Sequence, residues 1–439
     1  MSRHNVRIVF VYPDFERHAR ANPELREFVP AREYVGPPSL GIAHLAALTP
    51  ARHEIAFVDD RLNRFDPGME GDLFALSFFT PAATRGLEIA RALRAEGKQV
   101  VVGGIFPSLM PEECEGDGVA VVVGEGEPVW GQILDDAEAG RLRARYRAAG
   151  HYDLGGAPFP RLDLYLEAHR GLVDDYPVQH SRGCPFGCEA CAVPCAMGRQ
   201  MRFYPEEWVL RVLREFGEQG KLCSFTEDSA LLMAQGARIR FRKLLRRIIR
   251  EREEEGAAYR FSYLGASVPV LLSLEEETLK EIRRAGIRRF YLVCGFDPIT
   301  QDAFGRGIAG ALEKALAAVE RCRDHDILAY TSLLAGNPWD DAGVFDRCLE
   351  FTERGGIDLA EFVIATPYPG TPLWGQLEAE GRIFDRTWKH YNDANVVFRP
   401  HRMTERALRE GYLRMWREFY GRHAEVAVET DIIRNRVQF

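Results

Sequence analysis

The chain has 439 residues, a formal net charge of −8 at pH 7 and 46% hydrophobic residues. This length suffices for two or three domains that each bury a core. The acidic balance excludes a general nucleic-acid binder, because counterion release requires a basic surface, and it favours a cationic or neutral substrate. The first residues lack the apolar core and cleavage site of a secretion signal, and no apolar run approaches the roughly 20 residues that span a bilayer. We therefore expect a cytoplasmic protein without a membrane span.

Residues 1–144 alternate apolar runs with helical segments. The apolar runs are VRIVFVYP, EIAFVDD, LFALSFF, KQVVVGG and VAVVVGEGE, and TRGLEIARALRAEG predicts a helix. Apolar strands separated by helices predict a parallel sheet covered on both faces, so we expect a doubly wound, Rossmann-like α/β domain. Gly103-Gly104 and Gly124-Glu125-Gly126 follow strand ends, where such sheets bind ligands. Tight turns without a ligand are the alternative interpretation of these glycines.

A second α/β series follows a linker at residues 145–176 and occupies residues 177–372. Its predicted strands are PVQHSRG, LCSFTED, RFSYLGASV, RRFYLVCGF, ILAYTSLLAG and AEFVIATPY, and its helices include PEEWVLRVLREFGEQG, EEETLKEIRRAG and GVFDRCLEFTERGG. Six strand and helix pairs predict a complete or partial TIM-type barrel, whose loops after the strands carry the chemistry. We expect residues 373–439 to form a helical tail.

The segment ARIRFRKLLRRIIREREEEG predicts an amphipathic helix. Its apolar residues are Ile239, Phe241, Leu244, Leu245, Ile248 and Ile249, and its polar face runs from basic to acidic. An outer helix of the barrel with a solvated charged face is the favoured interpretation. A helix on a membrane surface is the alternative.

The sharpest feature is HSRGCPFGCEACAVPC, in which Cys184, Cys188 and Cys191 follow a predicted strand at the spacing C-x3-C-x2-C. Three thiolates on one tight loop can bind three irons of a [4Fe–4S] cluster, which is normally held by four cysteines. The fourth iron is then open to another ligand. Gly183 and Gly187 allow the loop to fold tightly around a cofactor.

A structural zinc knot is the alternative for this segment, with Cys195 as a fourth ligand. The protein would then be a non-catalytic zinc-binding module. We favour the cluster, because an isolated knot has no need to lie at the end of a barrel strand. The spread of the remaining cysteines along the chain also fits a reducing compartment with a metal or cluster site better than a set of disulfides.

This cysteine spacing after a strand resembles the radical S-adenosylmethionine (radical SAM) superfamily. The resemblance implies that SAM chelates the open iron and is cleaved reductively to a 5′-deoxyadenosyl radical, which abstracts hydrogen from a small-molecule substrate. The electron would come from a donor such as flavodoxin or ferredoxin. Cys184, Cys188 and Cys191 would be both the metal ligands and the catalytic residues.

The resemblance also implies positions for the contacts to SAM. Glu227 or Asp228, after the next strand, would bind the amino group, and Asp297, after the fourth strand, would bind the ribose. The residue before the third cysteine is usually aromatic in this superfamily, but here it is Ala190. The remaining candidate contacts are on or near the cysteine loop, at Phe186, Gly187 and Phe203, and the strand at Phe362 to Ile364 is an alternative that could hold the adenine.

Several further segments resemble the branch of this superfamily that has an N-terminal cobalamin (B12)-binding-type domain. They are GPPSLGIA (36–43), VVGGIFPSLMP (101–111), GEGE (124–127), SRGCP (181–185) and TPYPGTP (366–372). The likeness is particularly close to enzymes of the anaerobic chlorophyll-ring cyclase and hopanoid-modifying kind, so cobalamin is a candidate third cofactor. The D-x-H-x-x-G motif that supplies a histidine to cobalt is absent, since His44 and His53 lack the required neighbours.

The activity that we predict is cobalamin-dependent C-methylation of a small molecule, such as a secondary metabolite, sugar or lipid, by radical SAM chemistry. The alternative is a cobalamin-independent dehydration or deoxygenation of an aminoglycoside-type sugar. The carboxylates of Asp297, Asp340 and Asp341 would hold the ammonium groups of such a sugar.

Overall fold

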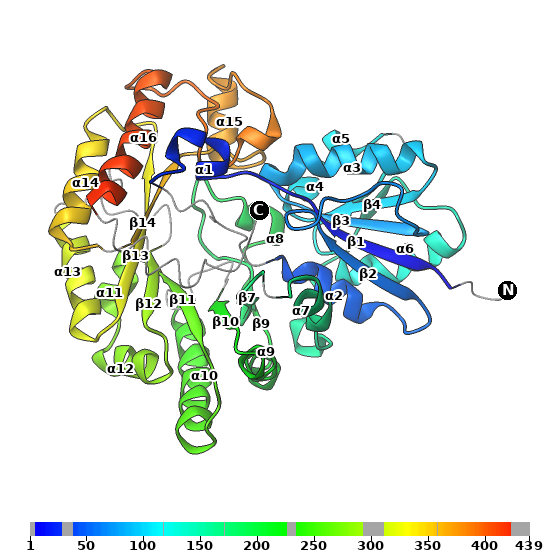
Figure 1. Ribbon diagram of the computed structural model, residues 1–439, viewed down its shortest axis with the longest axis horizontal. Helices are drawn as coiled ribbons and strands as arrows, with labels where there is room; N and C mark the ends of the chain where they lie inside the picture. The colour runs from blue at the N-terminus through cyan, green and yellow to red at the C-terminus, as the bar shows by residue number, and fades with distance from the viewer. Residues whose placement is uncertain are drawn as a thin grey trace.

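The computed structural model describes residues 5–28, 38–116, 118–170, 172–225, 234–292, 311–357 and 359–422. Their strands form two six-stranded sheets, both parallel, and one antiparallel pair. Figure 1 shows the first sheet on the right and the second on the left. None of the helices in the described ranges combines the length and the apolar composition that crossing a bilayer requires.

The first sheet has the strand order β2-β1-β3-β4-β5-β6. The strands are β1 (Arg7–Tyr12), β2 (Glu54–Asp59), β3 (Leu73–Ser77), β4 (Gln99–Gly103), β5 (Ala120–Val123) and β6 (Arg145–Arg147). The five apolar runs predicted as strands correspond to β1–β5. The order reverses direction between β1 and β3, and ligands bind parallel sheets at the carboxyl ends of the strands on either side of such a reversal.

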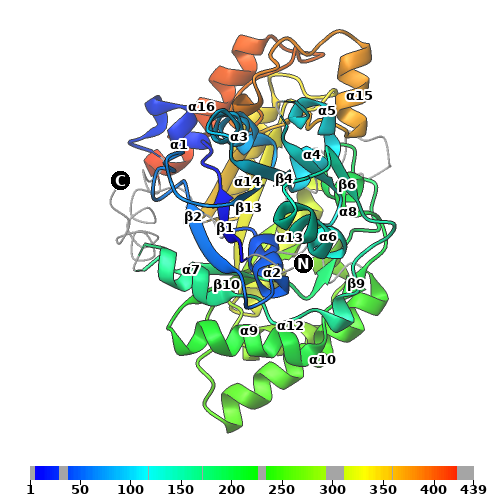
Figure 2. The ribbon, with the colours of Figure 1, turned by 90° about the vertical axis from the view of Figure 1, so that its right-hand side faces the viewer.

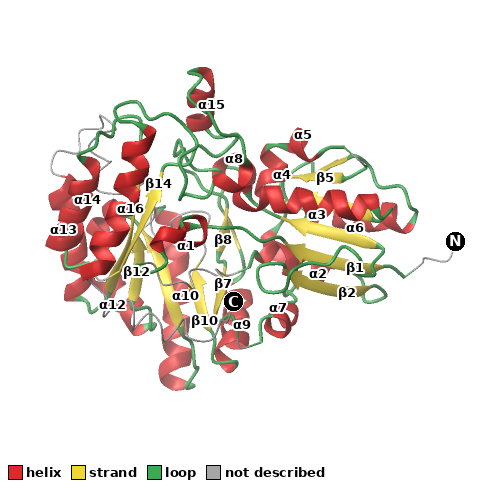
Figure 3. Ribbon diagram, turned by 45° about the horizontal axis from the view of Figure 1, so that its top comes forward, coloured by secondary structure: helices red, strands yellow, loops and turns green. Residues whose placement is uncertain are grey.

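Helices cover both faces of the first sheet. One group contains α2 (Leu40–Leu48), α6 (Glu127–Glu138) and α7 (Leu162–Ala168), and the other contains α3 (Ala83–Ala95), α4 (Ile105–Leu109) and α5 (Pro111–Cys114). Figures 1 and 3 show α3, α4 and α5 on one side of the sheet and α2 on the other. Short 3-10 turns complete this part at η2 (Thr80–Ala82) and η3 (Leu154–Gly156).

The second sheet follows the chain order, as β14-β13-β12-β11-β10-β7. Its strands are β7 (Asp175–Val178), β10 (Leu222–Phe225), β11 (Phe261–Ala266), β12 (Arg289–Leu292), β13 (Leu328–Ala335) and β14 (Leu359–Ile364). β10, β11, β12 and β13 lie within the runs predicted from the sequence, whereas β7 and β14 overlap their runs but begin two residues and one residue earlier. β7 and β14 are the two edges of the sheet.

The helices between these strands are amphipathic and pack their apolar faces inward. They are α9 (Glu206–Glu218), α10 (Gln235–Glu254), α11 (Val268–Ser273), α12 (Glu276–Arg284), α13 (Ala311–Asp324) and α14 (Val344–Arg354). In α10, Phe241, Leu244, Leu245 and Ile248 are fully buried, which confirms the interpretation as an outer helix of this layer. Ile239 differs from the expected pattern, because 60% of it is exposed.

The first and last described segments meet beside β14. The early segment contains α1 (His18–Ala21) and η1 (Pro23–Leu25), and the late segment contains α15 (Pro372–Ala379), η5 (Trp388–His390) and α16 (Glu405–Arg422). α16 packs against β14 and α14 and contacts η1. In Figure 1 the dark blue chain leaves the first sheet and places α1 beside α16.

Candidate active site

The three predicted cluster ligands lie on one loop between β8 (Ser181–Arg182) and α8 (Val193–Met197). Cys184 is buried, and Cys188 and Cys191 are half-buried. β8 pairs antiparallel with β9 (Arg202–Phe203), so the base of the loop is closed by backbone hydrogen bonds. The N–H of Cys184 donates to the carbonyl of Gly198 at 3.2 Å, and the N–H of Cys191 donates to the carbonyl of Cys188 at 3.2 Å.

The backbone conformation at the start of this loop requires glycine at position 183. Its φ is +84°, a conformation that favours glycine, and a Cβ at this position would overlap the carbonyl oxygen of Gln200. At Gly187, a Cβ would overlap only the end of the Arg199 side chain, which is flexible. The strict requirement for glycine therefore lies before the first cysteine.

The arrangement of the cysteines fits a cluster better than a single ion. Among the described residues, no three His, Cys, Asp or Glu side chains gather around one point where a metal ion could be held. A zinc knot needs four ligands that converge on one ion. In a cubane, by contrast, each cysteine binds a different iron, so the three sulfurs need not converge. Cys195, the fourth ligand of the zinc alternative, is exposed on α8.

The candidate SAM contacts divide into two groups. Phe186 is half-buried and Gly187 exposed on the cysteine loop, and Phe203 is half-buried on β9. The ring of Phe203 lies 4.9 Å from the guanidinium of Arg240 and 5.5 Å from the imidazole of His180. The structure thus brings these three candidates to one loop and its base. Glu227, Asp228 and Asp297 lie outside the described residues.

A cavity of about 900 Å³, including open solvent at its mouth, lies at the carboxyl ends of β1, β3, β4 and β5. The predicted ligand edge of the sheet is part of its wall, since Gly103, Gly104, Gly124 and Gly126 all line it. Gly124 has a φ of +87°, and a Cβ there would meet no atom within 4 Å, so this glycine leaves space open as well as making a turn.

The second part of the chain completes the wall of this cavity. Gln179, Arg182 and Met197 line it together with the residues of the first sheet. Arg182 immediately precedes the cysteine loop and Met197 ends α8. The cavity therefore lies between the first sheet and the segment that carries the cysteines.

A buried ion cluster joins the two sides of the cavity. Arg182 donates to Glu125 at 3.1 Å and to Glu127 at 2.7 Å, and Arg202 donates to Glu125 at 2.8 Å. Burial alone would raise the pKa of Glu125, but the N–H of Tyr152 and the guanidinium of Arg202 outweigh burial and lower it. This cluster fixes β8 and β9, and hence the base of the cysteine loop, to the first turn of α6. The GEGE and SRGCP segments contain Glu125, Glu127 and Arg182, but the sequence marked neither Arg202 nor the pairing of these residues.

His44 lies close to this region without facing the cavity. Its imidazole is fully buried and stacks on Trp208 at 5.5 Å, and its Nε2 lies 3.3 Å from the Tyr204 hydroxyl. Burial lowers the pKa of His44 well below its ordinary value, and the charge of Arg182 lowers it further. His53 accepts a hydrogen bond from the N–H of Val6. No histidine of the described residues lines the cavity.

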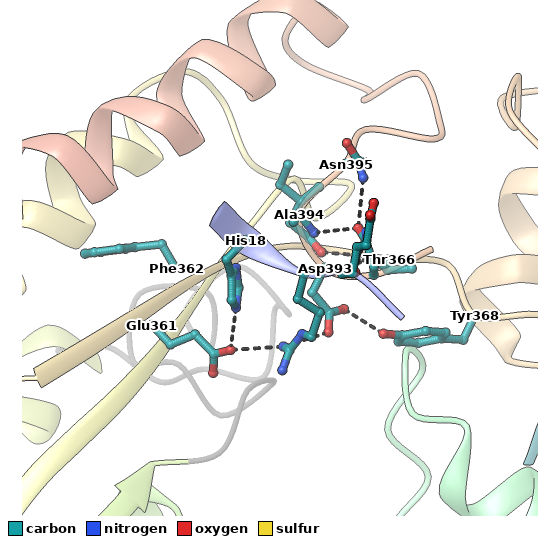
Figure 4. A network of polar contacts seen from close by, with 12 residues as sticks. His18, Glu361, Phe362, Thr366, Tyr368, Asp393, Ala394 and Asn395 are labelled. Atoms are coloured by element: carbon teal, nitrogen blue, oxygen red, sulfur yellow. Dashed lines mark hydrogen bonds and ion pairs between the residues drawn. The ribbon is translucent and has the colours of Figure 1, made fainter. Parts of the chain in front are cut away.

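A second buried network, drawn in Figure 4, joins the early segment to β14. Arg17 donates to Glu361 at 2.9 Å and to Asp393 at 3.1 Å, while His18 Nε2 lies 2.7 Å from the Glu361 carboxylate. The Tyr368 hydroxyl donates to Asp393 at 2.9 Å. Of these residues only Tyr368 lies in a segment marked in the sequence, TPYPGTP, and its pairing was not predictable because members of the network lie up to 376 positions apart.

Two of the carboxylates considered for an aminoglycoside, those of Asp340 and Asp341, already have hydrogen-bond partners within the protein. Asp340 is buried and accepts hydrogen bonds from the N–H groups of Gly336 at 3.0 Å and Asn337 at 2.9 Å. Burial raises the pKa of Asp340 to about 6. Asp341 accepts from the N–H of Gly343 at 3.0 Å and pairs with Arg347. Both carboxylates thus stabilise the loop after β13.

Comparisons with known proteins identify the chemistry. Residues 178–344 match the family model described as Radical SAM superfamily, and residues 371–425 match a Domain of unknown function (DUF4070). The chain is a radical SAM enzyme, as the cysteine spacing predicts, and a [4Fe–4S] cluster and SAM are the cofactors of this class.

Its relatives include methyltransferases and a cyclase. The chain is 27% identical to bacteriochlorophyllide d C-8(2)-methyltransferase of Chlorobaculum tepidum over 87% of this chain and 85% of that protein. It is 24% identical to the anaerobic magnesium-protoporphyrin IX monomethyl ester cyclase of Cereibacter sphaeroides over 81% of this chain and 61% of that protein. The resemblance to this branch is confirmed.

The fold is also that of a solved enzyme. The radical SAM methyltransferase TsrM from Kitasatospora setae superposes with a TM-score of 0.65 and 18% identity, covering 94% of this chain and 83% of that chain. TsrM has also been solved with cobalamin and a [4Fe–4S] cluster bound.

Proposed function

We propose that this chain is a cobalamin-dependent radical SAM methyltransferase that methylates an unactivated carbon of a small molecule. One observation carries the proposal: residues at the start and end of the cysteine segment, Arg182 and Met197, form part of the wall of the cavity at the carboxyl edge of the first sheet. A corrin in that cavity would face the groups held by the cysteines. The methyltransferases among the relatives support the same reaction.

We also propose how the chain is divided into domains for this function. Residues 1–144 would form a cobalamin-binding-type, Rossmann-like domain, followed by a linker at 145–176, a partial TIM barrel at 177–372 and a helical tail at 373–439. The strand order β2-β1-β3-β4-β5 supports the first domain, since doubly wound sheets with this order bind cofactors at their point of reversal. The two edges of the second sheet, β7 and β14, support a barrel that does not close.

We assign Cys184, Cys188 and Cys191 to the cluster, which would supply the electron for the reductive cleavage of SAM. The loop geometry supports this assignment, because the closed base at β8 and β9 and the turn at Gly183 hold the three side chains on one short segment. The proposed SAM contacts are Phe186, Gly187, Phe203, Glu227, Asp228 and Asp297.

The histidines of the described residues are poorly placed to bind cobalt. His44 packs against the rings of Tyr204 and Trp208, and no described histidine lines the cavity. The absence of the D-x-H-x-x-G motif agrees with this geometry. We therefore propose that a bound corrin receives no histidine ligand from the described part of the chain.

The test begins with protein made without oxygen in the presence of cobalamin. We expect iron, sulfide and corrin in the purified protein, and formation of 5′-deoxyadenosine from SAM and a reductant. Ser77→Phe would fill the cavity and should remove the corrin while iron and SAM cleavage are retained. Protein without corrin, whose turnover is indifferent to added cobalamin, would contradict the proposal.

The aminoglycoside alternative loses its structural support. Two of the three carboxylates considered for the ammonium groups are held within the loop after β13, and Asp297 lies outside the described residues. No described feature favours it as a second function.

A further inference from the structure

The exposed face of α10 is strongly basic in an acidic protein. Residues 235–250 contain seven Arg or Lys and no Asp or Glu, although the whole chain has a net charge of −8. The exposed stripe of this helix includes Ile239, Arg240, Lys243, Arg246 and Arg250. Figure 1 shows α10 projecting from the second sheet.

Neighbouring helices neutralise the middle of this stripe but not its start. Lys243 lies 3.6 Å from Glu206, and Arg246 pairs with Glu281 at 2.8 Å. Arg240 has no acidic partner among the described residues, and its guanidinium covers the ring of Phe203 instead. Within the described ranges, the positive charge near the N-terminal end of α10 therefore has no acidic side chain paired with it.

This end of α10 lies against the base of the cysteine loop. Phe203, under Arg240, is paired with Ser181 in the two-stranded sheet that closes the loop. Arg199 is exposed on the same segment, and its side chain lies over Gly187, between the first two cysteines. In Figures 1 and 2, β9 lies between α8 and α10.

An apolar residue stands beside these charges. Ile239 is 60% exposed, one of a few large hydrophobic side chains on the described surface. An apolar contact with charged residues around it is the usual composition of a transient protein interface. The face thus combines charge for long-range attraction with a contact for specific docking.

We propose that Arg199, Ile239 and Arg240 form the docking surface for a small acidic protein that carries one electron on a flavin or an iron–sulfur centre. The proposal rests on the proposed function, in which the cysteines hold the cluster that must be reduced. On docking, the reduced carrier loses one electron and the oxidised cluster gains it, with no transfer of atoms or protons. Charge complementarity selects this partner, because opposite charges accelerate the encounter of such proteins.

The test compares charge changes at the two ends of α10. Arg240→Glu and Ile239→Glu alter the proposed surface, whereas Arg250→Glu makes the same charge change about 15 Å farther along α10, at 1.5 Å per residue. Arg250 is also exposed and has no acidic partner among the described residues. The probe is a purified acidic flavodoxin.

The first measurement is the affinity of oxidised flavodoxin at several salt concentrations, which requires no turnover. We expect Arg240→Glu and Ile239→Glu to weaken binding about tenfold at low salt, and Arg250→Glu to weaken it less than twofold. The second measurement is the rate of 5′-deoxyadenosine formation. With reduced flavodoxin as the donor it should fall in parallel with the affinity, and with dithionite it should be unchanged.

Three results would overturn the docking surface. An equal loss of rate with dithionite would show that Arg240 acts on Phe203, and equal effects of Arg240→Glu and Arg250→Glu would show that the position of the charge is irrelevant. Binding of the unaltered protein to phosphatidylglycerol vesicles, abolished by Arg240→Glu, would assign the face to a membrane surface. If dithionite supports no SAM cleavage in the unaltered protein, the proposed function fails, while the measured affinities still decide the docking surface.

Discussion

Replacing Glu361 by glutamine removes a buried charge on which two distant parts of the chain converge. The side chain is 3% exposed and contacts Arg17 at 2.9 Å, His18 at 2.7 Å and the Tyr291 hydroxyl at 2.7 Å. Burial alone would raise the pKa of Glu361, but Arg17, His18 and Tyr291 together lower it to about 2. A carboxylate with a lowered pKa stabilises the folded state above its unfolded pKa, and this contribution disappears as the pH falls toward the folded value.

The size of the effect follows from the pKa. A shift from 4.5 to about 2 corresponds to about 3 kcal/mol of folding free energy at neutral pH. Removal of one partner from a buried ion pair gives a similar figure, about 3 to 5 kcal/mol. We therefore expect Glu361→Gln to lower the free energy of unfolding by about 3 kcal/mol at pH 7, and by much less at pH 3.

Guanidinium unfolding followed by tryptophan fluorescence measures this difference, because Trp416 lies 5.0 Å from His18. Trypsin should also cleave the early segment of the variant faster, at Arg20 or Arg26. Glu350→Gln is the matched control, since Glu350 is 53% exposed and pairs with Arg354 on the surface, where a pair is worth at most about 0.5 kcal/mol. If both variants lose equal stability, or if the loss in Glu361→Gln is the same at pH 3 and pH 7, the reasoning is refuted.

The remaining predictions concern the cysteine loop, the ion cluster and the second sheet. Cys184→Ala, Cys188→Ala and Cys191→Ala should each abolish iron binding and SAM cleavage with an unchanged circular dichroism spectrum, and Cys195→Ala should do neither; the reverse pattern would refute the ligand assignment. Glu125→Gln leaves Arg202 buried without a carboxylate and should cost about 3 to 5 kcal/mol in denaturant unfolding, part of which Arg202→Met should restore; additive losses in the double variant would refute the coupling. Burial raises the pKa of Asp175 to about 6, so its contribution to stability is lost as the pH rises through 6. Asp175→Asn should remove that loss, which falls mainly between pH 4 and pH 6, and an unchanged pH profile of the unfolding midpoint would count against it.

The strands were predictable because most are buried on both faces. The residues of β1 and β5 are almost all buried, so their apolar runs are unambiguous in the sequence. β6 was missed, because only Tyr146 of its three residues is buried and the sequence Arg-Tyr-Arg reads as linker. Ile239 was placed on the inner face of α10 by its periodicity, but the helix turns this residue to solvent.

The cysteine loop was predictable for a different reason, since its chemistry depends on spacing along the chain. The ion clusters depend on pairing in space. Arg182 and Glu125 lie 57 positions apart, and Arg17 and Glu361 lie 344 apart, so no local pattern reports either pair. In both cases the residue types were visible, but their partners were determined only by how the sheets pack.

The pairing of Arg17 with Glu361 sets an order of events during synthesis. The early segment leaves the ribosome 344 residues before its carboxylate partner. At 5 to 20 residues per second, this is a delay of roughly 20 to 70 s. The first sheet can form in that time. However, α1, which follows β1 in the chain, cannot bind β14 until this last strand of the second sheet has left the ribosome. Attachment of α1 to β14 is therefore a late step of folding, and a nascent chain stalled before residue 361 would expose this segment to chaperones and proteases.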